Sequence, residues 1–349
     1  MRAEIISFTD HGVVLAQKLA EELPGRGISC GAWVKKKDAV LPERVQALTI
    51  SLKEWTKEQF AKADVLIFIG AAGIAVRSIA PFVKSKKTDP AVLVADEQGK
   101  HVISLLSGHI GGANAMTHLV ARILGAEPVI TTATDLHGKF AVDAFAAGRG
   151  LYMDSMEYAK EIAAELVAGR RVGMQSAWPV FGPVPEELDQ EGAPFAGFAI
   201  DVKAVQPFAH TLHLVPRVMV LGIGCKKDTD GAHLKDIVLQ VLEEHGVYRE
   251  SICRIASIDL KKEEKGILAL ADDLNVPFVT YSSAELEQAE SEEGFTESEF
   301  VRSVAGVGNV CERAALTGAR TKRLLIPKTA REGVTVAAAV MDYTVCMED

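Results

Sequence analysis

The sequence predicts an α/β protein in which two α/β domains with mainly parallel sheets are joined by a small middle module. Short β-branched runs alternate with helical patterns in residues 1–135, and the alternation returns in residues 216–349. Between them, residues 136–215 combine helical patterns with a stretch rich in proline and glycine. Alternating strands and helices are typical of a parallel sheet with helices on its faces. A length of 349 residues agrees with two or three domains.

The N-terminal domain is expected to begin with a strand and to alternate from there. Its expected strands are EIISF, ISCGAWV, DVLIFIG, AVLVAD, HVISLLS and PVITT. Helical patterns lie between most of them, in HGVVLAQKLAEEL, SLKEWTKEQFAKA and IAVRSIAPFV, whereas only the turn-like EQGK separates AVLVAD from HVISLLS. We therefore expect one α/β domain that ends near residue 135.

A glycine-rich collar and a helix follow HVISLLS in the stretch LLSGHIGGANAMTHLVARILGA, residues 105–126. The helix should end at Gly125, because glycine readily adopts the positive φ of a helix C-terminus. Its spacing predicts an apolar face made of Ala115, Leu119, Ala121, Ile123 and Leu124.

The rest of the chain divides into the middle module and the C-terminal domain. In the middle module we expect helices at GKFAVDAFAAG and MDSMEYAKEIAAELVAG, and we assign no regular structure to the stretch 178–200. The C-terminal domain should contain the strands RVMVLGIG, SICRIASID, PFVTYS, RLLIPK and VTVAAAV, with helices at GAHLKDIVLQVLEEHG and KKEEKGILALADDL. A loop rich in serine and glutamate precedes the last two strands.

Composition excludes several classes of function. The net charge is −9 and no basic run is interleaved with aromatic residues, so we expect no nucleic-acid partner. No apolar run approaches the ~20 residues that cross a bilayer, and the N-terminus lacks the long apolar core of a secretory signal. We therefore expect a cytoplasmic protein without a membrane partner. A disulfide framework or structural zinc site is not expected, because the five cysteines form no C-x-x-C pair: Cys30, Cys225, Cys253, Cys311 and Cys346.

Three loops of the N-terminal domain follow expected strands: GAAGIAVR at 70–77, SGHIGGAN at 107–114 and TTATD at 131–135. Ligands of open α/β sheets bind outside the carboxyl ends of the strands. Glycines let backbone N–H groups approach a ligand, and a following helix N-terminus favours an anion. Tight strand-to-helix turns are the alternative explanation. The candidate binding residues are Gly70, Gly73, Arg77, Ser107, Gly108, Gly111, Gly112, Asn114, Thr131, Thr132 and Thr134.

His109 lies inside the collar, and we consider it as a general base, a hydrogen-bond donor or an axial metal ligand, since neutral imidazole can serve in all three roles. A structural histidine is the alternative. Asp135 is a second candidate base, although it precedes an expected helix and could only cap it.

The C-terminal domain repeats the pattern of glycine turns before helices, in GIGCKKDTD at 222–230 and GVGNVCERAAL at 306–316. In the second segment, Asn309 and Glu312 have the spacing of a helix cap, which explains them without a ligand. The candidate binding residues here are Gly222, Gly224, Cys225, Lys226, Gly306, Asn309, Glu312 and Lys328.

Together these segments resemble the cobalt-precorrin-5A hydrolase family of the anaerobic cobalamin pathway. The resemblance covers nearly the whole chain. In the first part it depends on GAAGIAVRSIAPFVKSKKTDPAVLVADEQGKHVISLLSGHIGGAN and PVITTATDLHGKFAVDAFA. In the last part it depends on GIGCKKDTD, IASIDLKKEEKG and GVGNVCERAAL with IPK.

The resemblance implies a hydrolase that opens the δ-lactone of cobalt-precorrin-5A with water and releases acetaldehyde, giving cobalt-precorrin-5B in the biosynthesis of cobalamin (vitamin B12). The substrate carries the cobalt, so neither a separate cofactor nor a protein metal site is expected. Its acetate and propionate arms need several anion pockets, which glycine loops at helix starts can supply. The expected partner is this substrate, while a homodimer and transient contacts with neighbouring pathway enzymes are left open. Local positive charge would come from Arg77, Lys84, Lys86, Lys87 and Lys328.

Lactone hydrolysis needs a base for water and a donor for the oxyanion. His109 and Asp135 are the candidate bases, and the backbone N–H groups of Gly111 and Gly112, with Asn114, are candidate donors. Two other functions are considered: a non-catalytic carrier of a cobalt-corrinoid intermediate, and a sugar-phosphate or nucleotide enzyme that uses the same loops. The glycine spacing matches neither a P-loop nor a dinucleotide fingerprint.

Overall fold

The computed structural model describes residues 1–36, 41–85, 88–108, 111–131 and 139–348. It confirms the α/β class with mainly parallel sheets. The chain forms two compact units, Met1–Arg149 and Gly150–Asp349, which are described separately. The expected segments 136–215 and 216–349 fall largely in the second unit, and their boundaries as domains stay a prediction.

The first unit contains a seven-stranded sheet in the order β3-β2-β1-β4-β5-β6-β7. All neighbouring strands are parallel except β5 and β6. The strands are β1 (Arg2–Ser7), β2 (Ser29–Val34), β3 (Val45–Ala47), β4 (Val65–Ile69), β5 (Ala91–Ala95), β6 (His101–Leu106) and β7 (Glu127–Val129).

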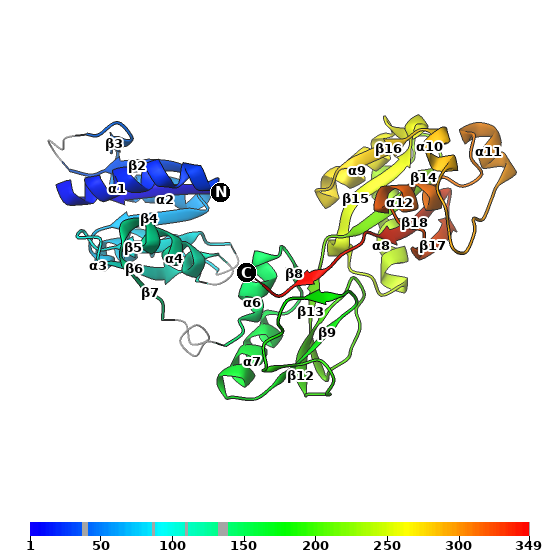
Figure 1. Cartoon of the computed structure of the whole chain (residues 1–349). Coiled ribbons are helices and arrows are strands. Elements are labelled where there is room, and N and C mark those ends of the chain that lie inside the picture. Colours follow the sequence, from blue (N-terminus) through cyan, green and yellow to red (C-terminus); the bar gives the residue numbers. More distant parts are fainter. Residues whose placement is uncertain (37–40, 86–87, 109–110, 132–138, 349) are drawn as a thin grey trace. The chain divides into compact units, whose positions relative to one another are not determined.

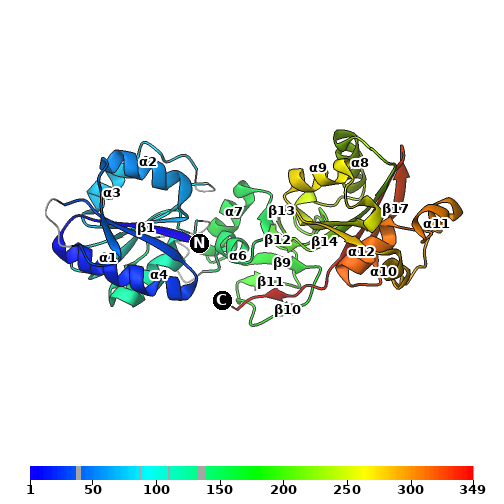
Figure 2. The same cartoon turned by 90° about the horizontal axis from the view of Figure 1, so that it is seen from above.

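Helices cover both faces of this sheet (Figure 2), so its strands are buried on both sides. On one face lie α1 (Asp10–Glu22) and α4 (Ala113–Leu124), and on the other lie α2 (Leu52–Lys62) and α3 (Ala72–Ile79). The short η1 (Pro24–Arg26) follows α1, and α6 (Val142–Gly148) lies near the end of the unit.

Strand β6 runs in the opposite direction to β5, and this determines where the glycine loops lie. Val92 pairs with Leu106 and Ala95 with Val102, so the turn at 97–100 closes a hairpin. The loop at 107–114 therefore begins at the edge of the sheet where β4 and β5 start, whereas the loop at 70–77 lies at the opposite edge. A five-residue strand separates the two edges by roughly 16 Å. Each loop follows the carboxyl end of its own strand, but the loops at 70–77 and 107–114 lie at opposite edges of the sheet.

Helix α4 confirms the expected helix after the collar, and it ends at Gly125 with φ 77°. Its buried face is shifted from the predicted one. Ala115 is exposed, because the face that follows helical spacing from Ala113 runs through Met116 and Val120 instead.

The second unit begins with a five-stranded sheet in the order β11-β9-β12-β13-β8, parallel except for β8. Helix α7 (Met156–Val167) packs against it (Figure 1). The stretch 178–200, to which no regular structure was assigned, contains three strands. The strands of this part are β8 (Tyr152–Met153), β9 (Val172–Ser176), β10 (Val180–Phe181), β11 (Leu188–Asp189), β12 (Ala196–Ile200) and β13 (His210–Val215).

A second five-stranded sheet follows in the order β16-β15-β14-β18-β17. Strands β14 (Met219–Cys225), β15 (Ile252–Ile258) and β16 (Phe278–Tyr281) are parallel, whereas β17 (Leu324–Arg331) and β18 (Val334–Val340) form an antiparallel hairpin beside β14. The last strand, β19 (Val345–Cys346), pairs with β10.

Helices also cover both faces of this second sheet. On one face lie α8 (Gly231–Glu244) and α9 (Lys265–Leu274), and on the other lie α10 (Ser283–Glu287) and α12 (Cys311–Ala319). The loop rich in serine and glutamate contains α10 and α11 (Glu299–Ala305). Two short turns, η2 (Arg249–Ser251) and η3 (Asp259–Lys261), flank β15. In the part of the chain that the structure describes, each helix is too short or too polar to cross a membrane.

Candidate functional site

A cavity of about 760 Å³ opens at the carboxyl ends of β14 and β15. We call it the C-terminal cavity. Because these strands are parallel, the residues that follow Cys225 and Ile258 meet at the same edge of the sheet. The start of α12, the helix α11 and the β17–β18 hairpin complete its walls. The structure thereby brings together five residues predicted from the sequence: Gly224, Cys225, Lys226, Asn309 and Lys328.

Two predicted glycines of β14 shape the framework of this cavity. A Cβ atom at Gly222 would lie 1.8 Å from the carbonyl oxygen of Cys311, so only glycine lets α12 pack against the strand. A Cβ at Gly224 would lie 2.5 Å from Oγ1 of Thr335, whose hydroxyl donates to the Gly224 carbonyl at 3.1 Å. Gly222 is therefore a packing residue, while Gly224 lies at the cavity wall.

Charged side chains of both signs line the cavity: Lys226, Lys227, Lys261 and Lys328, with Asp228, Glu263 and Glu264. Nζ of Lys261 lies 2.8 Å from Oε2 of Glu264, and both side chains are largely buried. The stem of Lys226 lies against Gly333, and its backbone N–H donates to the Gly333 carbonyl. Within the described ranges, the ammonium groups of Lys226 and Lys227 have no carboxylate partner, so they remain available to an anionic ligand.

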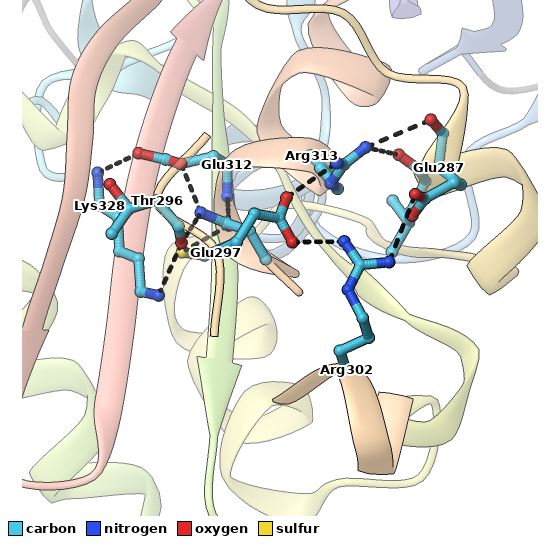
Figure 3. A network of polar contacts seen from close by, with 10 residues as sticks. Glu287, Thr296, Glu297, Arg302, Glu312, Arg313 and Lys328 are labelled. Atoms are coloured by element: carbon cyan, nitrogen blue, oxygen red, sulfur yellow. Dashed lines mark hydrogen bonds and ion pairs between the residues drawn. The ribbon is translucent and has the colours of Figure 1, made fainter. Parts of the chain in front are cut away.

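The N-cap of α12 is Val310, one residue after the expected Asn309, but Asn309 still binds Glu312 (labelled in Figure 3). The Glu312 N–H donates to Oδ1 of Asn309 at 3.0 Å. The buried Glu312 carboxylate does not reach back to the Asn309 backbone but accepts hydrogen bonds from the Asn309 amide and from the Lys328 N–H, the latter at 2.8 Å. Glu312 thus connects α12 to β17. Gly306 also has a framework role, because it ends α11 with φ 78°.

Two thiols line the same cavity. Burial raises the pKa of Cys225, although the charge of Lys261 and a hydrogen bond to Thr229 oppose the shift. Burial raises the pKa of Cys311 to about 11. Both side chains are therefore neutral thiols near pH 7 and add no negative charge to the site.

In the first unit, the residues predicted after β4 lie at an exposed corner. The guanidinium of Arg77 lies over Gly73, where a Cβ would be 3.5 Å from Nη2. Gly70 is packed against the ring of Phe8. Arg77 is an exposed residue in the last turn of the eight-residue helix α3, and its side chain extends back toward the first turn, where Gly73 lies.

The described part of the collar is held by internal hydrogen bonds. Ser107 has φ 59° and donates from Oγ to the Asp89 carbonyl at 3.1 Å. The buried Asn114 accepts from Oγ of Ser104 at 2.6 Å, and its N–H donates to the Gly108 carbonyl at 2.9 Å. A Cβ at Gly111 would lie 2.4 Å from Cβ of Ser107, and Gly112 adopts φ 79° before α4. Close packing thus explains Gly111, whereas Gly112, whose added Cβ would meet no atom within 4 Å, is explained by its positive φ.

Several predicted residues lie outside the described residues: Lys86, Lys87, His109, Thr132, Thr134 and Asp135. Thr131 is exposed after β7, at the same edge of the sheet as the collar. Among the described residues, no group of three His, Cys, Asp or Glu side chains could hold a metal ion.

Sequence reasoning missed the apolar wall of the C-terminal cavity, which contains Leu260, Phe300 and Val304. Lys261 and Glu264, which also line the cavity, were not among the residues predicted for the site. Phe300 and Val304 have the spacing of one helix face, and this pattern was the available signal.

The fold and the cavity define an α/β protein that can bind a small anionic molecule with an apolar face. Residues 54–135 match the family model described as Cobalamin synthesis G N-terminal, and residues 219–339 match Cobalamin synthesis G C-terminus. The chain belongs to the cobalt-precorrin-5A hydrolase family.

Two relatives carry this family name. The chain is 36% identical to the cobalt-precorrin-5A hydrolase of Salmonella typhimurium, over 96% of this chain and 97% of the relative. It is 31% identical to that of Priestia megaterium, over 97% and 95% of the two chains. A crystal structure of a cobalamin biosynthesis protein G homolog from Sulfolobus solfataricus aligns over 97% of both chains, with 24% identity and a TM-score of 0.41.

Proposed function

We propose that this chain hydrolyses cobalt-precorrin-5A to cobalt-precorrin-5B and releases acetaldehyde. Relatives of the same name match it along nearly its whole length. The observation that carries the proposal is the C-terminal cavity, which combines lysines without carboxylate partners in the described ranges and an apolar wall.

The chemistry of the substrate agrees with this cavity. A cobalt-precorrin is a broad apolar ring system surrounded by acetate and propionate arms. Its carboxylates require cations, and its ring requires an apolar surface. A volume of about 760 Å³ lies within the usual range of small-molecule sites. Lys226, Lys227 and Lys328 supply ammonium groups for the arms.

The reaction needs water activated at the lactone carbonyl. In our proposal, His109 or Asp135 removes a proton from this water, and the N–H groups of Gly111 and Gly112 stabilise the oxyanion. Opening the lactone frees a hydroxyl on the former meso carbon. Loss of its proton and cleavage of the carbon-carbon bond release acetaldehyde, while the electron pair and a proton stay on the macrocycle.

Further parts of the proposal follow from the same substrate. The chain needs no cofactor of its own, because the cobalt arrives with the substrate. It works in the cytoplasm and binds neither nucleic acid nor membranes, whereas a homodimer and contacts with neighbouring pathway enzymes stay predictions.

An acetaldehyde assay tests the reaction. Purified protein is incubated with cobalt-precorrin-5A without oxygen, and we expect one acetaldehyde for each substrate consumed. Protein that binds the tetrapyrrole but releases no acetaldehyde above a control without enzyme is a carrier, and the proposed hydrolysis is then wrong.

A further inference from the structure

Helix α11 presents large apolar side chains to the C-terminal cavity without burying them in the protein. Phe300 is 78% exposed and Val304 is 64% exposed, and both line the cavity. Leu260, on η3, is 68% exposed and lines the same cavity. We call these three residues the apolar clamp. Exposed apolar side chains gathered at one cavity are typical of a binding surface.

Helix α11 is attached to the domain through charged side chains. It has no buried residue, and Figures 1 and 2 both show it projecting from the rest of its domain. Arg302 donates from Nη2 to Glu297 at 2.8 Å, and its Nη1 lies 3.6 Å from Glu287 (Figure 3). Because Arg302 lies about 160–200° around the helix from Phe300 and Val304, the apolar face and the anchored face are opposite.

Glu297, the partner of Arg302, is itself connected to the core of the domain. Glu297 accepts a second hydrogen bond, at 2.9 Å, from the buried Arg313 of α12. Arg313 also donates to the carbonyl oxygens of Leu286 and Glu287 and lies over the ring of Phe295. The carboxylate of Glu297 packs against Gly308, where a Cβ would lie 1.6 Å from Oε2. These contacts fix the base of α11 and leave its apolar side chains exposed.

Charge identifies the kind of molecule that can cover the clamp. Lys226 and Lys227 line the cavity together with it, and their ammonium groups have no carboxylate partner among the described residues. Among the residues that the structure describes, Nζ of Lys328 contacts only the backbone carbonyl oxygen of Thr296, at 3.4 Å. A purely apolar partner would leave these cations desolvated and unpaired. The cavity is also lined by Asp228, Glu263 and Glu264, of which Glu264 is paired with Lys261. We therefore expect an occupant with an apolar face and with anionic groups that face the other lysines.

We propose that the apolar clamp covers the ring face of the cobalt-precorrin macrocycle, while Lys226 and Lys328 bind its carboxylate arms. The identity of the macrocycle rests on the proposed function. Leu260 on η3 and Phe300 on α11 come from different elements of the cavity wall, so a broad ring that contacts both would be bound in preference to a smaller anion. Phe300 and Val304 are thus specificity residues that act in binding.

A binding titration of the full chain tests this proposal. The probe is cobalt uroporphyrin, an eight-carboxylate tetrapyrrole without a lactone, which cannot undergo the reaction. We expect Phe300→Ser with Val304→Ser to raise the Kd about 10- to 100-fold, because two apolar contacts are lost. The control is Val14→Ser, which changes an equally exposed apolar residue on α1 and should leave the Kd unchanged.

Salt dependence separates the two parts of the site. Lys226→Gln with Lys328→Gln should weaken binding and reduce its dependence on salt, whereas the clamp variant should retain the salt dependence of the unchanged protein. Melting temperatures of all variants should stay near that of the unchanged protein, since the substituted clamp side chains are exposed.

Three results would overturn the clamp: no binding of the probe by the unchanged protein, equal affinity of the clamp variant, or a concentration-dependent dimer that this variant abolishes. The last result would mean that a second copy covers the surface. The proposed hydrolysis is judged separately by acetaldehyde, so binding without acetaldehyde refutes the reaction and leaves the clamp intact.

Discussion

Nδ1 of His213 lies 2.7 Å from Oδ2 of Asp154, and its Nε2 lies 2.6 Å from the carbonyl oxygen of Val205. A carbonyl and a carboxylate can only accept hydrogen bonds, so both ring nitrogens must carry protons and the buried imidazole is cationic. Asp154 also accepts from the hydroxyl of Tyr248 at 3.0 Å. Because Tyr248 lies between α8 and β15, this cluster joins the two larger sheets of the second unit.

We predict that His213→Gln lowers the free energy of unfolding by about 1.5–3 kcal/mol at about pH 6, the usual contribution of hydrogen bonds to a charged group. Burial alone would lower the pKa of His213, but the hydrogen bonds to Asp154 and Val205 and the charge of Asp154 raise it above 6.5. A raised folded-state pKa stabilises the protein below the unfolded value, and this contribution is lost as the pH rises through the folded value. The difference between the two proteins should therefore shrink by about pH 9.

Asp154 gives the opposite pH dependence, because its contribution to stability is lost at acidic pH. Burial would raise the pKa of Asp154, but the hydrogen bonds from His213 outweigh it and lower the pKa below 3.8. Its contribution is present above that value and is lost as the pH falls further. Denaturant unfolding at several pH values checks both limits, with the exposed His118→Ala as control. An effect of His213→Gln that is equal at pH 6 and pH 9 would contradict a cationic His213.

Gly222→Ala should destabilise the second unit by about 1–3 kcal/mol, the usual cost of overpacking. The added Cβ would lie 1.8 Å from the Cys311 carbonyl oxygen, so α12 must move away from β14. The control is Gly25→Ala, since a Cβ there meets no atom within 4 Å. Urea unfolding measures both variants, and equal stability of the two would refute the packing role of Gly222.

Glu332→Asn should stabilise the β17–β18 hairpin by on the order of 0.5 kcal/mol. The two-residue turn has positive φ at both positions, 45° at Glu332 and 86° at Gly333, and asparagine tolerates this conformation better than glutamate. The contact of the exposed Glu332 with His233, at 3.6 Å, contributes little. Thermal unfolding checks the gain against Glu191→Asn, an exposed loop position without positive φ. A loss of stability in Glu332→Asn would contradict the turn argument.

Hydrophobic patterns predicted most elements of the two α/β parts, because buried parallel strands are continuous apolar runs and their helices have a 3.6-residue period. The direction of β6 was not predicted, since an apolar run such as HVISLLS does not show whether its strand pairs in a parallel or an antiparallel way. The turn EQGK was the available signal, as a short connection with glycine favours a hairpin. The strands between residues 178 and 200 were missed because proline and glycine conceal their period.

The candidate site was predicted in part. Cys225 and Lys226 were found because they follow a strand, and Asn309 because a glycine turn precedes a helix. Gly222 was assigned to the ligand, although it contacts α12, since sequence does not show which backbone approaches a glycine. Phe300 was missed because an apolar residue in a polar loop is usually a minor contact, and only the fold shows that it lines a cavity.

The collar connects these predictions to catalysis. Ser107 is hydrogen-bonded to Asp89, and Asn114 is hydrogen-bonded to Ser104 and Gly108. These bonds hold the described residues on both sides of His109. His109 itself lies outside the described residues. In the sequence His109 is surrounded by Gly108, Gly111 and Gly112, and from this pattern we expect its contribution to folding to be small.

We therefore predict that His109→Ala lowers acetaldehyde release by about 10²- to 10⁴-fold, the usual loss when a positioned acid or base is removed. The free energy of unfolding should change by less than about 1 kcal/mol. Loss of a mere ligand contact would instead raise KM while kcat stays nearly unchanged. Asp135→Asn is the parallel variant, because Asp135 is the competing base and helix capping would be its structural role. If His109→Ala keeps near-normal turnover but melts at a much lower temperature, His109 is structural and Asp135 becomes the first candidate for the base.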